Sequence, residues 1–182
     1  LELGQALQRL GADVTFFNPF PQIGPFTDPE VQRVSREILA AELDLQTESK
    51  VHEALARDNG IELRWTDAKG TDRVSLFEKV LVAAERRPNL EGLDLQATGL
   101  ALNERGQPEW DARTCQAGDS PIFLAGDISG HRPLLHEASD EGRIAGANAA
   151  QYPNVCAHVR REPLAVAFTD PNMAMIGRSY AE

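Results

Sequence analysis

Cysteine and aromatic residues are scarce in this 182-residue sequence, which contains 2 cysteines and 6% aromatic residues. The cysteines, Cys115 and Cys156, lie too far apart in the chain for a CxxC redox motif or a zinc ribbon. We therefore expect ordinary free thiols, no metal site and a reduced, cytoplasmic location. The chain also begins without an initiator methionine or a signal peptide, which suggests that Leu1 is not a natural start.

Positive charge is in short supply as well, because 18 Lys and Arg face 28 Asp and Glu, for a formal net charge of −10. Nucleic acids and anionic membranes are bound mainly through clustered Lys and Arg, so neither is an expected partner. No apolar run approaches the ~20 residues that a membrane-spanning helix needs. A composition of 42% hydrophobic and 25% charged residues is instead typical of a soluble globular protein.

The pattern of the first 40 residues predicts a helix, a strand and a second helix. A stripe of leucines indicates a helix over residues 2–10, and residues 13–17 have strand character. Three prolines and a glycine make residues 18–25 a loop. Thr27 and Glu30 have the spacing of a capping box, which predicts that the second helix begins there.

The following segments predict a small antiparallel meander and then a buried strand. Residues 50–57, 61–65 and 73–76 are the expected strands of the meander, and the alternation of apolar and polar residues is clearest in the second. The apolar run at 79–84 is of the kind found at the centre of a sheet. The order of elements predicts an α/β fold that resembles a dinucleotide-binding domain without its first strand.

A candidate ligand site follows in the second half of the chain. Residues 122–125 predict a short buried strand, which ends at Gly126 and Asp127 before a helix over residues 136–150. In open α/β sheets ligands lie beyond the carboxyl ends of strands, and glycine permits close backbone approach. An aspartate there can accept hydrogen bonds from sugar or polyol hydroxyls. The alternative from this local pattern is that Asp127 only caps a turn.

Four separated stretches, in the same order, resemble the flavin-dependent pyridine nucleotide–disulfide oxidoreductases, and among them most closely the dihydrolipoamide dehydrogenases. One stretch is similar to the residues that follow the Gly-rich NAD fingerprint, one to the end of an Ala-Thr-Gly-Arg-x-Pro-Asn segment, one to the second FAD motif, and one to the start of the interface domain. These stretches are Leu1–Gln5, Arg86–Asn89, Ile122–Asp127 with Leu134–Ala138 and Glu141-Gly142, and Ala167–Pro171 with Ile176-Gly177.

The resemblance implies a role for each matching residue. Glu2 matches the glutamate that ends a GxGxxGxE fingerprint, near the nicotinamide, and Val51 matches a position beside the adenine. Asp127 matches the residue that accepts hydrogen bonds from the flavin ribityl chain. The stretch Pro133, Leu134, Leu135 and His136 matches a segment whose backbone lines the flavin. The implied cofactors are FAD and NAD(P).

Two residues depart from the family pattern. Asn18 ends the second strand of the complete fold, where a glutamate would bind the ribose hydroxyls of NAD and repel a 2′-phosphate, so the choice between NAD and NADP stays open. Glu85 stands where the family has a glycine beside the dinucleotide. It either weakens the nicotinamide site or points away from it.

The sequence contains neither the redox cysteine pair nor the catalytic His-Glu pair of the family. We therefore expect the middle piece of an enzyme, inactive alone, with residues 1–89 from the NAD(P)-binding domain, 90–162 from the C-terminal part of the FAD-binding domain and 163–182 from the start of the interface domain. The whole enzyme would be a homodimer that passes electrons from a small or lipoyl dithiol through flavin to NAD(P)+. The alternatives are a non-catalytic dinucleotide-binding module, or a glutathione, mercuric or transhydrogenase-like reductase of the same superfamily.

Overall fold

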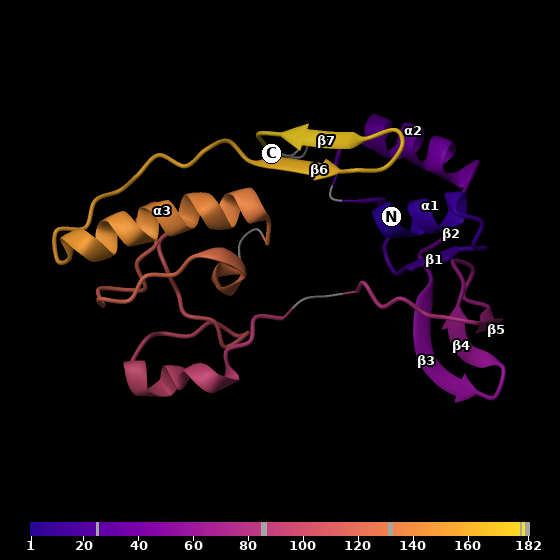
Figure 1. Cartoon of the computed structure of the whole chain (residues 1–182), viewed down its shortest axis with the longest axis horizontal. Coiled ribbons are helices and arrows are strands. Elements are labelled where there is room, and N and C mark those ends of the chain that lie inside the picture. Colours follow the sequence, from indigo (N-terminus) through magenta and orange to yellow (C-terminus); the bar gives the residue numbers. More distant parts are fainter. Residues whose placement is uncertain (25, 85–86, 131–132, 179, 181–182) are drawn as a thin grey trace. The chain divides into compact units, whose positions relative to one another are not determined.

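The computed structural model describes residues 1–24, 26–84, 87–130, 133–178 and 180 (Figure 1). The chain divides into two compact units, one formed by Leu1–Ala83 with Pro163–Glu182 and the other by Ala84–Glu162. Each unit is described by itself below. In the described ranges, no helix combines the length and the apolar character that a bilayer crossing requires.

The first unit begins with a helix, which a β-α-β segment follows. Helix α1 (Glu2–Arg9) leads to β1 (Thr15–Asn18), and α2 (Pro29–Ala40) then leads to β2 (Asp44–Thr47). Strands β1 and β2 pair in parallel, from Thr15 opposite Asp44 to Asn18 opposite Thr47. Parallel neighbours need a crossover connection, and α2 supplies it. The predicted order of helix, strand and helix is confirmed.

Helix α2 begins one residue later than the capping-box spacing predicts. Asp28, and not Thr27, is the N-cap residue, and its carboxylate accepts hydrogen bonds from the backbone N–H groups of Glu30 (2.8 Å) and Val31 (3.2 Å). Pro29 follows at the first helical position, where its missing N–H costs no hydrogen bond. The aspartate side chain therefore satisfies the helix donors that the prediction gave to a threonine.

The predicted meander is present as a three-stranded antiparallel sheet of β3 (Lys50–Arg57), β4 (Gly60–Thr66) and β5 (Asp72–Phe77), in the order β3-β4-β5. The buried face of this sheet carries Trp65, whose ring meets that of Phe17 edge-on at a centroid distance of 5.0 Å. Phe77 also contacts Phe17, at 5.8 Å. Because Phe17 belongs to β1, these aromatic contacts attach the meander to the β-α-β segment.

The core of the first unit is closed by residues from the far end of the sequence. Strands β6 (Leu164–Ala167) and β7 (Met173–Ile176) form an antiparallel hairpin. Met173 joins the buried residues of and around α2 in one cluster, which consists of Ile23, Phe26, Leu39, Leu43 and Met173. The hairpin thus belongs to the same packed unit as α2 although more than 120 residues separate them.

The stripe of leucines that predicted the first helix is exposed in the structure. Leu3 and Leu10 are 67% and 84% exposed, whereas Gly4 and Gln5 are buried. Gly4 packs directly against the ring of Phe16, so closely that a Cβ atom could not be accommodated there. The helix therefore approaches β1 through its smallest residue, and the leucines point elsewhere.

The described residues of the second unit form three short 3-10 helices and one long helix. The short helices are η1 (Glu91–Leu93), η2 (Leu95–Thr98) and η3 (Gly126–Ser129), and the long one is α3 (Leu135–Gln151). Its core is small and consists of Cys115, Ile144 and Ala145, with Trp110, Phe123 and Ala125 packed around them. The predicted helix over 136–150 is confirmed.

Two predicted strands are wrong. Residues 79–84 have no strand at any described position, and Leu81 and Val82 are 65% and 81% exposed. Residues 122–125 contain only an isolated bridge between Phe123 and Gln116. An apolar run becomes a strand only when a neighbouring strand satisfies its backbone groups, and no described strand pairs with either run.

Candidate functional site

The predicted site residues are divided between the two units. Glu2, Asn18 and Val51 belong to the first unit, whereas Gly126, Asp127 and the stretch 133–136 belong to the second. Glu85 lies outside the described residues. Each group is therefore built up separately.

Asn18 lies at the carboxyl end of β1, where a parallel sheet presents its ligand edge. Its side chain is held within its own loop, since Nδ2 donates to the Gln22 carbonyl (2.7 Å) and Oδ1 accepts from the Phe20 N–H (3.3 Å). Its carbonyl accepts from the N–H of Ser49, next to the start of β3, where Val51 is 41% exposed. Asn18 thus lies near β3, which contains Val51, and its side-chain amide is hydrogen-bonded within its own loop.

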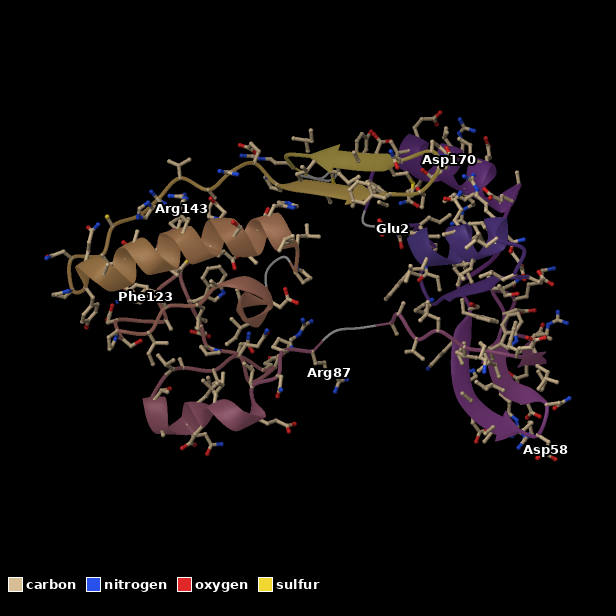
Figure 2. The ribbon with its side chains drawn as sticks, in the orientation of Figure 1. Glu2, Asp58, Arg87, Phe123, Arg143 and Asp170 are labelled. Atoms are coloured by element: carbon tan, nitrogen blue, oxygen red, sulfur yellow. The ribbon has the colours of Figure 1, made fainter. Side chains whose placement is uncertain are left out.

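Glu2 is the first of three polar residues on α1 that bind the turn between β6 and β7. Glu2 Oε1 accepts a hydrogen bond from the Phe168 N–H at 2.7 Å. Gln5 both donates to the Asp170 carbonyl (2.9 Å) and accepts from the Asp170 N–H (2.7 Å), and Arg9 pairs with the Asp170 carboxylate at 2.7 Å. Figure 2 labels Glu2 at the start of the helix and Asp170 in the turn. One oxygen of the Glu2 carboxylate is therefore fixed by the backbone of a distant segment.

Gly126 and Asp127 form a tight turn at the start of η3. Gly126 has a φ of +80°, a backbone conformation that favours glycine, and its neighbour Asp127 is exposed. The Asp127 carbonyl accepts from the Gly130 N–H at 3.2 Å, which closes the turn. A glycine conformation followed by an exposed carboxylate is an arrangement in which a ligand can approach the backbone and hydrogen-bond to the acid.

Side chains from outside the turn hold it in place. The Gly126 N–H donates to Oε2 of Glu141, a residue of α3, at 2.7 Å. At the other end of the turn, Trp110 Nε1 donates to the Ser129 carbonyl at 3.0 Å. Glu141 is fully buried, so its carboxylate binds the turn in a water-poor environment, where a charged acceptor is strongest.

The segment 133–136 leads into α3. Leu134 is the N-cap residue in extended conformation and makes no side-chain cap hydrogen bond. Leu135 is 88% exposed, and Pro133 and His136 are exposed as well. An uncapped helix start with an exposed apolar side chain offers backbone N–H groups and the positive end of the helix dipole to a ligand.

An ion-pair cluster that was not predicted from the sequence contacts the turn through Glu141. Arg160 Nη2 lies 2.7 Å from Glu137 Oε2 and 3.2 Å from Glu141 Oε1, and Arg160 Nε lies 3.4 Å from Asp140 Oδ2. Burial opposes the charged form of Arg160, but the Glu137 and Glu141 carboxylates outweigh it and raise its pKa above the ordinary value. The spacing of the three acids, at i, i+3 and i+4 of a helix, was the available signal, since it places them on one face.

The two cysteines differ in their surroundings. Cys115 is fully buried, and burial, reinforced by the Glu141 carboxylate, raises the pKa of its thiol to about 11. Cys156 is exposed, and both thiols are free. Throughout the part of the chain that the structure describes, no three His, Cys, Asp or Glu side chains are grouped closely enough to hold a metal ion.

Comparison with known proteins gives a consistent result. Residues 1–142 match the sequence profile of a family described as pyridine nucleotide-disulphide oxidoreductase. A dihydrolipoyl dehydrogenase of Thermus scotoductus is 34% identical over 152 residues, which cover 82% of this chain and 33% of that protein. A dihydrolipoyl dehydrogenase of Staphylococcus aureus is 32% identical over 183 residues, which cover 100% of this chain and 38% of that protein.

Solved structures of similar proteins agree with the sequence matches. The crystal structure of LpdA from Mycobacterium tuberculosis superposes with a TM-score of 0.81 and 25% identity, over 99% of this chain and 38% of that one. The described fold is thus the FAD- and NAD-binding fold of these oxidoreductases, as predicted. The chain spans little more than a third of the length of the relatives it matches.

Proposed function

Because this chain belongs to the pyridine nucleotide-disulphide oxidoreductase family, we propose that it is part of an FAD-dependent disulfide oxidoreductase, with dihydrolipoamide dehydrogenase as its specific activity. Members of this family use FAD and NAD(P). The specific activity is supported by the two relatives named as dihydrolipoyl dehydrogenases, each more than 30% identical. The observation that carries the proposal is the match over residues 1–142, which includes the turn at Asp127.

The proposed division of the chain assigns residues 1–89 to the NAD(P)-binding domain, 90–162 to the FAD-binding domain and 163–182 to the interface domain. The changes between compact units at residues 83 and 163 support a boundary near each of these positions, and residues 163–182 pack in the same unit as residues 1–83. The parallel β1–β2 pair with α2 as crossover supports a dinucleotide-binding role for the first segment, since such folds bind ligands at the carboxyl ends of parallel strands.

The residues of the second unit fit a flavin. Asp127 follows a glycine with a positive φ and exposes a carboxylate, which suits the hydroxyls of a ribityl chain. The backbone of Pro133–His136 leads into the N-terminus of α3, where the N-cap residue Leu134 makes no side-chain cap hydrogen bond, and this suits an electron-rich ring or a phosphate. Gly126 allows the backbone to approach closely. In this proposal these residues bind and orient FAD, which supplies the electron transfer.

The residues of the first unit fit a pyridine nucleotide less completely. Val51 offers an exposed apolar side chain for an adenine, and Glu2 offers a carboxylate at the start of α1. Asn18 stands at the ribose position but its amide is hydrogen-bonded within its own loop. A neutral group so engaged neither binds two ribose hydroxyls strongly nor repels a 2′-phosphate, so we propose weak discrimination between NAD and NADP.

The proposed partners are a lipoyl or small-molecule dithiol and a second copy of the whole enzyme, in the cytoplasm. We expect the 182 residues alone to have no catalytic activity. Neither Cys115 nor Cys156 belongs to a redox cysteine pair, and the sequence contains no match to the catalytic His-Glu pair of the family. In the whole enzyme, electrons would pass from the dithiol through flavin to NAD(P)+.

The test is the visible absorbance of the purified protein that carries this chain, followed by titration of its flavin-free form with FAD. We expect a yellow protein, and we expect Asp127→Asn to weaken FAD binding by ten- to a hundredfold, since a hydrogen bond to a charged group contributes about 1.5–3 kcal/mol. Asp119→Asn, at another exposed aspartate of the same unit, is the matched control and should leave the affinity unchanged.

The substrates separate the remaining possibilities. NADH-dependent reduction of lipoamide supports the proposal, whereas reduction of glutathione disulfide in its place would indicate another reductase. A protein that binds NADH but stays colourless with FAD would refute the proposal and indicate a non-catalytic dinucleotide-binding module.

A further inference from the structure

The carboxylate of Glu141 links the turn at Asp127 to a segment that lies beyond the end of α3. One oxygen, Oε2, accepts the Gly126 N–H at 2.7 Å, and the other, Oε1, lies 3.2 Å from Arg160 Nη2. Glu141 has no exposed surface, and the side chain of Arg160 is 17% exposed. Both oxygens of this buried acid are therefore engaged, one by the turn and one by the arginine.

Arg160 is itself held by more than one contact. It pairs with Glu137 at 2.7 Å, lies 3.4 Å from Asp140, and donates to the carbonyl of Ala112 at 3.4 Å. A guanidinium group can satisfy several acceptors at once because its five N–H donors are arranged in a rigid plane. Residues 153–162, which contain Arg160 and have no helix or strand, are thereby attached to the first two turns of α3.

This arrangement makes the direction of the Gly126 N–H depend on Arg160. A buried carboxylate whose second oxygen lacked a partner would turn toward another donor, and this change would weaken its hydrogen bond to the turn. With Arg160 in place, both oxygens of the Glu141 carboxylate have a partner and the carboxylate keeps a single orientation. Asp127 follows Gly126 directly, so the hydrogen bond from the Gly126 N–H to Glu141 also fixes the backbone position from which the Asp127 side chain extends.

We propose that Glu141 and Arg160 are positioning residues that hold the Gly126–Asp127 turn in the geometry that binds the flavin, acting through the hydrogen bond from Gly126 N–H to Glu141. Neither residue is expected to touch the cofactor. The inference rests on the proposed flavin role of Asp127. The hydrogen bond itself can be tested without any cofactor.

The test compares Arg160→Gln and Arg160→Lys with Arg161→Gln in the flavin-free protein that carries this chain. Arg161 is the matched control, because it is the next residue, is 83% exposed and, among the residues that the structure describes, forms an ion pair only with Asp140, at 3.9 Å. Hydrogen–deuterium exchange of peptides that cover residues 124–130 reports the Gly126 hydrogen bond. FAD titration of the same samples reports the geometry of the turn.

We expect Arg160→Gln to speed exchange at Gly126 and to weaken FAD binding, each by about tenfold, which corresponds to the loss of one charge-assisted hydrogen bond. Peptides from the far end of α3 should exchange at an unchanged rate, whereas a general loss of stability would accelerate exchange throughout the helix. Arg160→Lys keeps the charge and should recover much of the affinity, and Arg161→Gln should behave as the parent.

Unchanged exchange at Gly126 in Arg160→Gln would overturn the inference, as would acceleration spread evenly over the whole of α3. Faster exchange at Gly126 with unaltered FAD affinity would also overturn it, because the bond would then exist without serving the cofactor. If the parent protein binds no FAD at all, the proposed function fails, and with it the flavin part of this inference. The exchange data would still decide whether Arg160 holds the turn.

Discussion

Alanine at position 126 should destabilise the protein although there is room for its methyl group. Among the described residues, a Cβ atom on Gly126 would meet the Ala138 Cβ alone, at 3.5 Å, which is an ordinary van der Waals contact. The backbone conformation is the obstacle, because φ is +80° and a residue with a side chain pays about 1–2 kcal/mol there. We expect Gly126→Ala to lower the free energy of unfolding by that amount, measured by urea denaturation followed by circular dichroism.

The same substitution at Gly142 should have the opposite effect. Gly142 lies in the interior of α3 with a helical φ, and outside the helix's own nearby backbone no described residue would lie within 4 Å of an added Cβ. Alanine in a helix interior is more stable than glycine by about 0.5–1 kcal/mol, so Gly142→Ala should raise the free energy of unfolding. Equal effects of the two substitutions, or a stabilising Gly126→Ala, would refute the assignment of the strain to the backbone of the turn.

Three further outcomes follow from burial and charge. At pH 8, Ellman's reagent should modify Cys156 quickly and Cys115 only after denaturation, because burial and Glu141 raise the Cys115 pKa to about 11; two fast thiols would contradict this. Hydrogen bonds from Arg9 and then Gln5 lower the pKa of Glu42, so its contribution to stability is complete above about pH 4.5 and is lost as the pH falls through the lower folded-state pKa. The free energy of unfolding, measured by chemical denaturation, should therefore fall less for Glu42→Gln than for the parent between about pH 5 and pH 3. An equal fall in the two proteins would show that Glu42 does not contribute to the pH dependence of stability. Ile144→Ala should cost about 2–5 kcal/mol of unfolding free energy, because Ile144 is fully buried, and a cost below about 1 kcal/mol would show that the small core of the second unit collapses around the gap.

The local pattern of the sequence was sufficient for the elements whose signal lies within a few residues. The meander followed from alternation, with Leu63 and Trp65 on the buried face. The long helix α3 was predicted over residues 136–150, within one residue of its observed bounds at each end. The family followed from short stretches that occur in the same order as in that family, because each stretch is a local pattern of residue types that can be recognised without tertiary contacts.

The errors have a common cause, which is that the missing information lies in contacts between distant residues. The apolar runs at 79–84 and 122–125 have the composition of strands, but a strand exists only where a partner completes its hydrogen bonds. The leucines of α1 mark a helix correctly, yet the close packing of Gly4 on Phe16 decides which face is buried.

The candidate site shows the same division. The sequence by itself indicated that the chain turns at Gly126 and Asp127, because glycine and aspartate have local conformational and hydrogen-bonding preferences. It also determined the position of Glu141 on a helix. Only the tertiary structure decided that Glu141 binds Gly126 and that Arg160 binds Glu141, since 15 and 19 residues separate these pairs and folding alone brings them together.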